Sequence, residues 1–129
     1  GLGGPLMRAA GCEQLYPLAD LAVMGLGGVL GKLPTFFRVA DLAERHIRRT
    51  RPDAVVMIDY PGFHFALAKR LKSHGVPCYF FVPPQVWAWK RGRVRKMRKY
   101  FAGVLTALPF EDEWYRARHV RTHYVGHPY

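Results

Sequence analysis

A single acid, Asp59, stands where a parallel sheet would present a chemical group. It follows an apolar run, residues 54–58, that is typical of a strand buried on both faces of such a sheet. Pro61 and Gly62 then predict a turn before the next helix. Because open α/β sheets bind ligands at the carboxyl ends of their strands, Asp59 could accept a proton from a substrate hydroxyl. An Asp that caps the following helix is an equally good interpretation.

The second group of candidate residues is basic. Residues 90–99 hold seven Lys and Arg side chains, and Val94, Met97 and Phe101 form a narrow apolar stripe, which predicts a cationic amphipathic helix. A solvated helix face is the ordinary explanation of such charges. Seven like charges repel one another, however, and the formal net charge of the chain is +11. Nucleic acid phosphates or acidic lipid headgroups would both offset that repulsion.

An apolar segment, residues 21–37, mixes bulky side chains with glycines and a single lysine. It is either part of the core or an exposed patch that dips into a lipid interface or holds acyl chains, with Lys32 at the level of the headgroups. On the second interpretation the contacting side chains are Met24, Leu26, Val29, Leu30, Leu33, Phe36 and Phe37.

Three other patterns, of glycines, histidines and tryptophans, are weaker evidence of function. The Gly25–Leu30 stretch resembles a dinucleotide fingerprint but lacks its third glycine, and the Gly31-Lys32 pair lacks the remainder of a phosphate loop. Histidines recur at 119, 123 and 127, but a predicted strand at 124–125 breaks the helical spacing that a metal would need. We therefore expect no metal and no cofactor. Trp87 and Trp89 could line a sugar or acyl pocket, or pack in the core.

The elements that must position these residues alternate between strands and helices. Apolar periodicity and breaker residues predict helices over 6–10, 36–50, 63–71, 93–101 and 111–119 and strands over 54–58, 76–82, 103–108 and 123–125. This alternation predicts an α/β fold, a parallel sheet with helices on both faces.

Length and composition set the outer limits. A chain of 129 residues suits one domain. Two distant cysteines indicate reduced thiols in a cytosolic protein rather than a disulfide framework. No apolar stretch is long enough to cross a membrane, and no signal-peptide pattern is present. The chain starts without methionine, and both ends read as loops, so we expect a fragment of a longer protein.

With these segments in order, the chain resembles the N-terminal part of lipid-A-disaccharide synthase, a bacterial glycosyltransferase of the lipid A pathway. The resemblance runs along nearly the whole chain, and its most specific motifs are Ile58-Asp59-Tyr60-Pro61-Gly62-Phe63 and Gln85-Val86-Trp87-Ala88-Trp89. It implies that residues 1–129 are most of the acceptor-side, Rossmann-like half of a two-domain GT-B fold. The first strand and loop of that half, and the C-terminal donor domain, would lie outside this chain.

The resemblance also implies a reaction. In it, the 6-hydroxyl of 2,3-diacylglucosamine 1-phosphate attacks the anomeric carbon of UDP-2,3-diacylglucosamine with inversion, giving a β-1,6 disaccharide and UDP. The family's essential aspartate falls on Asp59, and residues 26–37 match its membrane-associating region. Candidate acceptor contacts are Pro61, His64, Gln85, Trp87 and Trp89; candidate contacts to phosphate or anionic lipid are Lys32, Lys90, Arg91, Arg93, Arg95 and Lys96.

Three positions depart from the family's pattern. Gly62 stands where many members have a second Asp, His64 replaces a common Asn, and Pro83 replaces a common Ser. A mechanism with paired carboxylates therefore has no support here. We expect a cytoplasmic, peripheral protein of the inner membrane, and no turnover by the 129-residue piece alone. The competing interpretations are a basic nucleic-acid-binding α/β module and a non-catalytic remnant retained for interaction.

Overall fold

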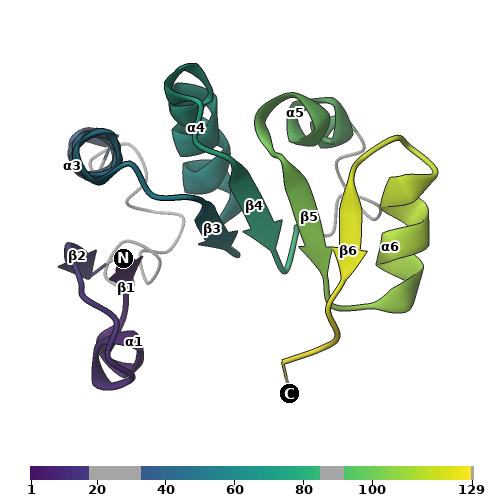
Figure 1. The fold of residues 1–129 in the computed structure, drawn as a ribbon, viewed down its shortest axis with the longest axis horizontal. Helices are drawn as coiled ribbons and strands as arrows, with labels where there is room; N and C mark the ends of the chain where they lie inside the picture. The colour runs from purple at the N-terminus through teal and green to yellow at the C-terminus, as the bar shows by residue number, and fades with distance from the viewer. Residues whose placement is uncertain (18–32, 85–91, 129) are drawn as a thin grey trace. The chain divides into compact units, whose positions relative to one another are not determined.

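The computed structural model describes residues 1–17, 33–84 and 92–128 and contains two compact units, Gly1–Thr50 and Arg51–Tyr129 (Figure 1). In the first unit, two short strands pair in parallel, with Leu2 opposite Tyr16. Its elements are β1 (Leu2–Gly3), α1 (Pro5–Ala9), β2 (Tyr16–Pro17) and α3 (Leu33–Thr50). The first residues thus form a strand, not the loop that the sequence predicted.

Helix α3 buries one stripe of small and branched side chains. Its buried residues are Val39, Ala40, Ala43 and Ile47, which recur at the helical spacing that the sequence predicted. The helix already includes Leu33, three residues before the predicted start.

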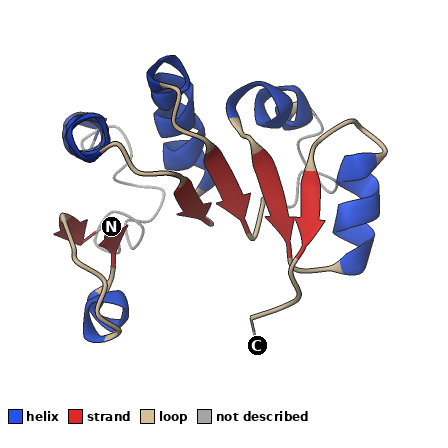
Figure 2. Ribbon diagram, in the orientation of Figure 1, coloured by secondary structure: helices blue, strands red, loops and turns tan. Residues whose placement is uncertain are grey.

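The second unit is a four-stranded parallel sheet with the strand order β3-β4-β5-β6, and a helix follows each of the first three strands (Figure 2). Its elements are β3 (Val55–Ile58), α4 (Pro61–Leu71), the 3₁₀ turn η3 (Lys72–His74), β4 (Cys78–Phe81), α5 (Arg93–Tyr100), β5 (Gly103–Thr106), α6 (Pro109–Arg116) and β6 (Thr122–Tyr124). The predicted α/β fold with a parallel sheet and flanking helices is confirmed.

The two faces of this sheet differ in burial. Strand register aligns Met57, Phe80, Val104 and Thr122 on one face, and all four are buried. Because strand order follows chain order and β-α-β crossovers are right-handed, α4, α5 and α6 cover that same face.

Strand β3 is less buried than its sequence predicted. On the face opposite Met57, Val56 and Ile58 are 54% and 50% exposed. The expectation that residues 54–58 are buried on both faces is therefore wrong. The reason is that α4, α5 and α6 cover only the Met57 face of this sheet, and β3, at one edge of it, has a neighbouring strand on one side only.

Aromatic rings join the sheet to its helices. The Phe80 ring of β4 stacks on Phe101 with ring centroids 5.1 Å apart, and it meets the edges of Phe65 and His64 of α4, each with centroids 5.9 Å apart. Phe63 also lies fully buried on α4. This cluster holds α4 against the sheet, and α4 follows directly after Asp59 and Tyr60.

Candidate functional site

Asp59 lies at the carboxyl end of β3, in an unusual backbone turn. It is exposed, its φ is 52°, and the next residue, Tyr60, has a φ of 42°. Asp tolerates this left-handed region through its short polar side chain, whereas Tyr adopts it at a cost. The backbone N–H of Asp59 still donates to the Phe81 carbonyl at 3.3 Å, so the strand pairing extends to the acid itself.

Asp59 does not cap the helix that follows. The residue at the N-cap of α4 is Tyr60, and no side chain caps that helix end by a hydrogen bond. Pro61 occupies the first turn, where its missing N–H costs nothing. The capping interpretation is therefore wrong, and the carboxylate of Asp59 is left exposed at the sheet edge.

The neighbouring strand ends in the same way. Ile58 pairs with Phe81, and Val82, the residue after Phe81, has a φ of 52°. A positive φ at a β-branched residue is a true outlier and persists only where the surrounding structure enforces it. Two adjacent strands thus leave the sheet through left-handed residues, Asp59 and Val82, at one edge.

His64 of α4 forms a hydrogen bond to the residue just before this turn. Its side chain is only 7% exposed, and its Nε2 donates to the Ile58 carbonyl at 3.2 Å, one residue before Asp59. Nδ1 is buried without a partner among the described residues. Burial lowers the pKa of His64, against smaller opposite effects of the bond to Ile58 and the charge of Asp59. A neutral ring with its proton on Nε2 fits this environment.

The chain after β4 is anchored by a helix far along the sequence. The hydroxyl of Tyr115, a fully buried residue of α6, donates to the Pro84 carbonyl at 3.1 Å. Burial raises the pKa of Tyr115, and the charge of Glu111 adds to that effect, so the hydroxyl stays a donor. Pro84 directly precedes the acceptor candidates Gln85, Trp87 and Trp89, which lie outside the described residues.

Only the end of the apolar segment is described. Leu33 and Phe37, in the first turns of α3, are 41% and 50% exposed, while Phe36 is partly exposed and meets the Phe37 ring edge-on. No helix within the described ranges is long and apolar enough to cross a bilayer. Met24, Leu26, Val29, Leu30 and Lys32 lie outside the described residues.

The basic helix is confirmed as amphipathic over its described part. Val94 and Met97 of α5 are buried. Arg95, Lys96, Arg98 and Lys99 are exposed. Arg93 is partly exposed and lies over the Phe65 ring, with its guanidinium carbon 5.7 Å from the ring centroid. Lys90 and Arg91 lie outside the described residues.

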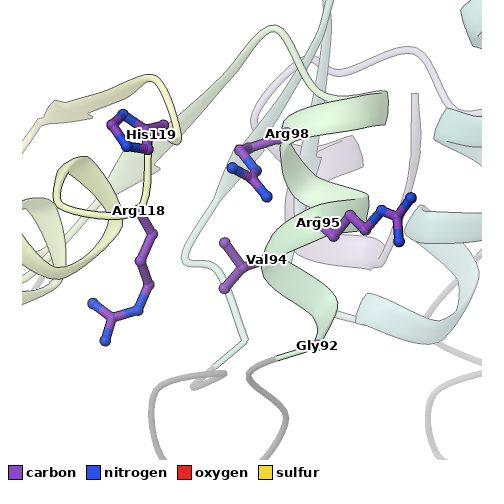
Figure 3. A pocket seen from close by; sticks show the side chains of 6 residues that line it. All are labelled: Gly92, Val94, Arg95, Arg98, Arg118 and His119. Carbon is purple, nitrogen blue, oxygen red and sulfur yellow. The ribbon is translucent and has the colours of Figure 1, made fainter.

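Beside α5 there is a hollow of about 540 Å³ (Figure 3). It is lined by Gly92, Val94, Arg95, Arg98, Arg118 and His119. Sequence reasoning missed Arg118 and considered His119 only as a possible metal ligand, because only the fold brings the end of α6 next to α5. The basic stretch Arg116–Arg121 was the available signal. Within residues 1–17, 33–84 and 92–128, no three His, Cys, Asp or Glu side chains gather as a metal site would require.

These features define a class: an α/β unit with a parallel sheet that presents an exposed acid, Asp59, at the carboxyl end of a strand. The family model described as lipid-A-disaccharide synthetase matches residues 1–129. The chain belongs to this family.

Individual relatives agree with the family match. Lipid-A-disaccharide synthase of Koribacter versatilis is 42% identical over 128 residues, which are 99% of this chain and 34% of the relative. The synthase of Syntrophotalea carbinolica is 46% identical over 129 residues, 99% of this chain and 33% of the relative. That of Alkalilimnicola ehrlichii is also 46% identical over 129 residues, 99% of this chain and 34% of the relative. The chain therefore spans about a third of the length of the curated relatives it matches.

Proposed function

We propose that this chain is most of the acceptor-side domain of an inverting glycosyltransferase of lipid A biosynthesis, with Asp59 as the general base. The observation that carries the proposal is the position of Asp59, exposed at the carboxyl end of β3 in a left-handed turn. Residues with strained backbone conformations cluster at active sites. Ligands of open parallel sheets bind at the carboxyl ends of the strands, which is where Asp59 lies. Family membership supplies the reaction class.

In the proposed reaction, the acceptor is 2,3-diacylglucosamine 1-phosphate and the donor is UDP-2,3-diacylglucosamine. The carboxylate of Asp59 accepts the proton of the acceptor's 6-hydroxyl as its oxygen attacks the donor's anomeric carbon. The new bond between O6 and that carbon forms as the bond to the UDP oxygen breaks, and the electron pair leaves with UDP. Attack from the face opposite UDP gives the β-1,6 disaccharide.

His64 has a positioning role in this scheme. The hydrogen bond from His64 to the Ile58 carbonyl fixes the last residue of β3, and Asp59 follows that residue directly. A base must be held within hydrogen-bond reach of the proton it abstracts, so a turn fastened to α4 favours catalysis. Gly62 supports a single-carboxylate mechanism, because it removes the second acid from this turn.

The proposed location is the acidic cytoplasmic surface of the inner membrane, where the acylated substrates would reside. The exposed apolar side chains of Leu33 and Phe37 and the exposed cations of α5 support this placement. Exposed apolar side chains and exposed basic side chains are each typical of proteins that bind an acidic lipid interface. The donor site would be supplied by the part of the protein that lies outside this chain.

The proposal is tested by disaccharide formation in the full-length protein, comparing wild type with Asp59→Asn. General-base catalysis contributes about 10²- to 10⁴-fold, so Asp59→Asn should lose activity by that factor with unchanged unfolding. Asp53→Asn is the matched control, because Asp53 is also exposed and precedes the same strand at its other end. Wild-type turnover in Asp59→Asn would remove Asp59 from the mechanism. No product from wild type would refute the reaction and favour the nucleic-acid module.

A further inference from the structure

The second unit carries an unusual imbalance of charge. From Tyr60 to Phe110 the sequence holds no Asp or Glu, while Lys and Arg recur along α4, α5 and the segment between β4 and α5. The sequence therefore offers no carboxylate within this stretch to neutralise α5. Clustered cations without internal counter-charges raise the local potential and attract anions.

Some of these basic side chains line the hollow beside α5. Figure 3 shows Arg98 extending from α5 towards the wall formed by Arg118 and His119, while the guanidinium of Arg95 points to the other side of the helix. A smaller adjoining hollow of about 310 Å³ shares Arg98 and His119 and adds Arg121 to its lining. Arg98 of α5 and Arg118, which follows α6, thus line the same hollow.

Arg118 is held in place before any ligand arrives. Its guanidinium carbon lies 3.8 Å from the centroid of the Trp114 ring, and one of its terminal nitrogens donates to the Trp114 carbonyl at 3.0 Å. A guanidinium carries five N–H donors, so this anchoring leaves donors for a further acceptor. Stacking on an aromatic ring restricts the side chain, which lowers the entropy that is lost when a ligand binds.

No acid within the described ranges forms an ion pair with the arginines of the hollow. The ion pair of this region, Arg116 with Asp112 at 2.7 Å, lies within α6 and leaves Arg98 and Arg118 uninvolved. Planar guanidinium groups match the tetrahedral oxygens of phosphate with paired N–H donors. The arginines of the hollow therefore have the side-chain chemistry that suits a phosphate group.

We propose that this hollow binds a phosphate group, with Arg98 and Arg118 as its principal contacts and His119 at its rim. The part of the hollow lined by Arg98 and His119 lies near the amino ends of β5 and β6, since α5 ends before Gly103 and His119 precedes Thr122. Asp59 lies at the opposite, carboxyl ends of the strands. The proposal goes beyond the transferase reaction and does not depend on it.

The position of the hollow on the open surface allows two sources of phosphate, a lipid headgroup or a soluble phosphate. A nucleic-acid strand fits less well, because strands bind along extended basic tracks with aromatic platforms for the bases. Here the arginines line a single hollow, and the Trp114 ring is already covered by Arg118.

The test compares Arg98→Gln with Lys99→Gln in the full-length protein. Both side chains are exposed neighbours on α5 and each change removes one charge, but only Arg98 lines the hollow. Inorganic phosphate is titrated while the arginine side-chain N–H signals are followed by NMR. In a second arm, the protein is sedimented with phosphatidylcholine vesicles with and without phosphatidylglycerol. In a third, it is mixed with single-stranded DNA.

We expect Arg98→Gln to weaken phosphate binding about tenfold, as loss of a charged hydrogen bond would, and Lys99→Gln to weaken it less than twofold. If Arg98→Gln also weakens binding to phosphatidylglycerol vesicles, the natural ligand of the hollow is a lipid headgroup. If it weakens only the binding of inorganic phosphate, the natural ligand is a soluble phosphate. Equal effects of the two substitutions, or DNA binding that exceeds both other arms, would overturn the proposal. Arg98→Gln leaves the turn at Asp59 intact, so its effect is separable from the test of the transferase.

Discussion

We predict that His64 makes this protein sensitive to mild acid, and that His64→Gln removes the sensitivity. The Nε2 of His64 donates to the Ile58 carbonyl at 3.2 Å, and a glutamine amide can place a donor nitrogen at a similar distance from the backbone. Glutamine does not titrate. The substitution therefore separates the hydrogen bond, which it keeps, from the protonation equilibrium, which it removes.

The burial of His64 decides the direction in which stability changes with pH. Desolvation holds the pKa of His64 in the folded protein below its ordinary value of 6.5, which the unfolded chain regains. Between these two pKa values the unfolded state binds more protons, so stability falls as pH falls. One proton gives a slope of at most about 1.4 kcal/mol per pH unit. At pH 7.5, His64→Gln should cost about 1 kcal/mol, because it loses the edge contact with the Phe80 ring.

The assay is urea unfolding followed by circular dichroism at pH 7.5, 6.5 and 5.5, for wild type and His64→Gln. The other histidines are present in both proteins, so their contributions cancel when the free energy of unfolding of the variant is subtracted from that of wild type. We expect the stability gap at pH 7.5 to shrink steadily and to close or reverse by pH 5.5. Phe65→Leu, which alters another ring in edge contact with Phe80 and introduces no titratable group, is the matched control and should show a constant gap. A constant gap for His64→Gln would refute the argument from burial.

The remaining predictions concern the core, one long-range contact and the cysteines. Phe80→Ala should lower the free energy of unfolding by about 3–5 kcal/mol in urea titrations, because Phe80 is fully buried among aromatic rings. Tyr115→Phe should cost about 1–2 kcal/mol and speed proteolysis after β4, since it leaves the Pro84 carbonyl without its donor. Iodoacetamide should modify half-buried Cys12 at pH 8 and spare Cys78, whose burial raises its pKa to about 11.

Two further variants serve as controls for these predictions. Phe110→Ala makes the same chemical change as Phe80→Ala at a residue that is 49% exposed, and it should cost less than about 1 kcal/mol. Tyr124→Phe removes a hydroxyl from a residue that is 53% exposed and should leave proteolysis unchanged. Urea should expose Cys78 to iodoacetamide. Equal losses of stability in Phe80→Ala and Phe110→Ala would contradict the first prediction, and equal proteolysis of Tyr115→Phe and Tyr124→Phe would contradict the second. Alkylation of Cys78 in the folded protein would contradict the third.

Much of the second unit could be predicted from sequence because its signals are local. The apolar run before Asp59, the Pro61-Gly62 turn and the stripe of Val94 and Met97 each report on their own element. Element boundaries were less exact, as α6 begins at Pro109 and not at residue 111. The reason is that proline at a first turn extends a helix backwards beyond its apolar stripe.

What the sequence could not predict depends on contacts between distant residues. The hollow needs Arg98 and Arg118, which only the packing of α5 beside the end of α6 brings together. Nothing in a valine predicts the left-handed backbone of Val82, since that conformation is imposed by its surroundings. The half exposure of Ile58 likewise follows from strand order, which periodicity does not reveal.

The bond from Tyr115 to the Pro84 carbonyl has a consequence for biosynthesis. The two residues are separated by 31 positions, so a ribosome makes Pro84 well before its partner. The turn that ends β4 therefore remains without this anchor until α6 has emerged and packed on the sheet. A ribosome stalled between these residues should expose the Val82–Pro84 turn to protease, and release past α6 should protect it. The turn beside the strand that carries Asp59 is thus completed only after α6, a helix made later, has packed on the sheet.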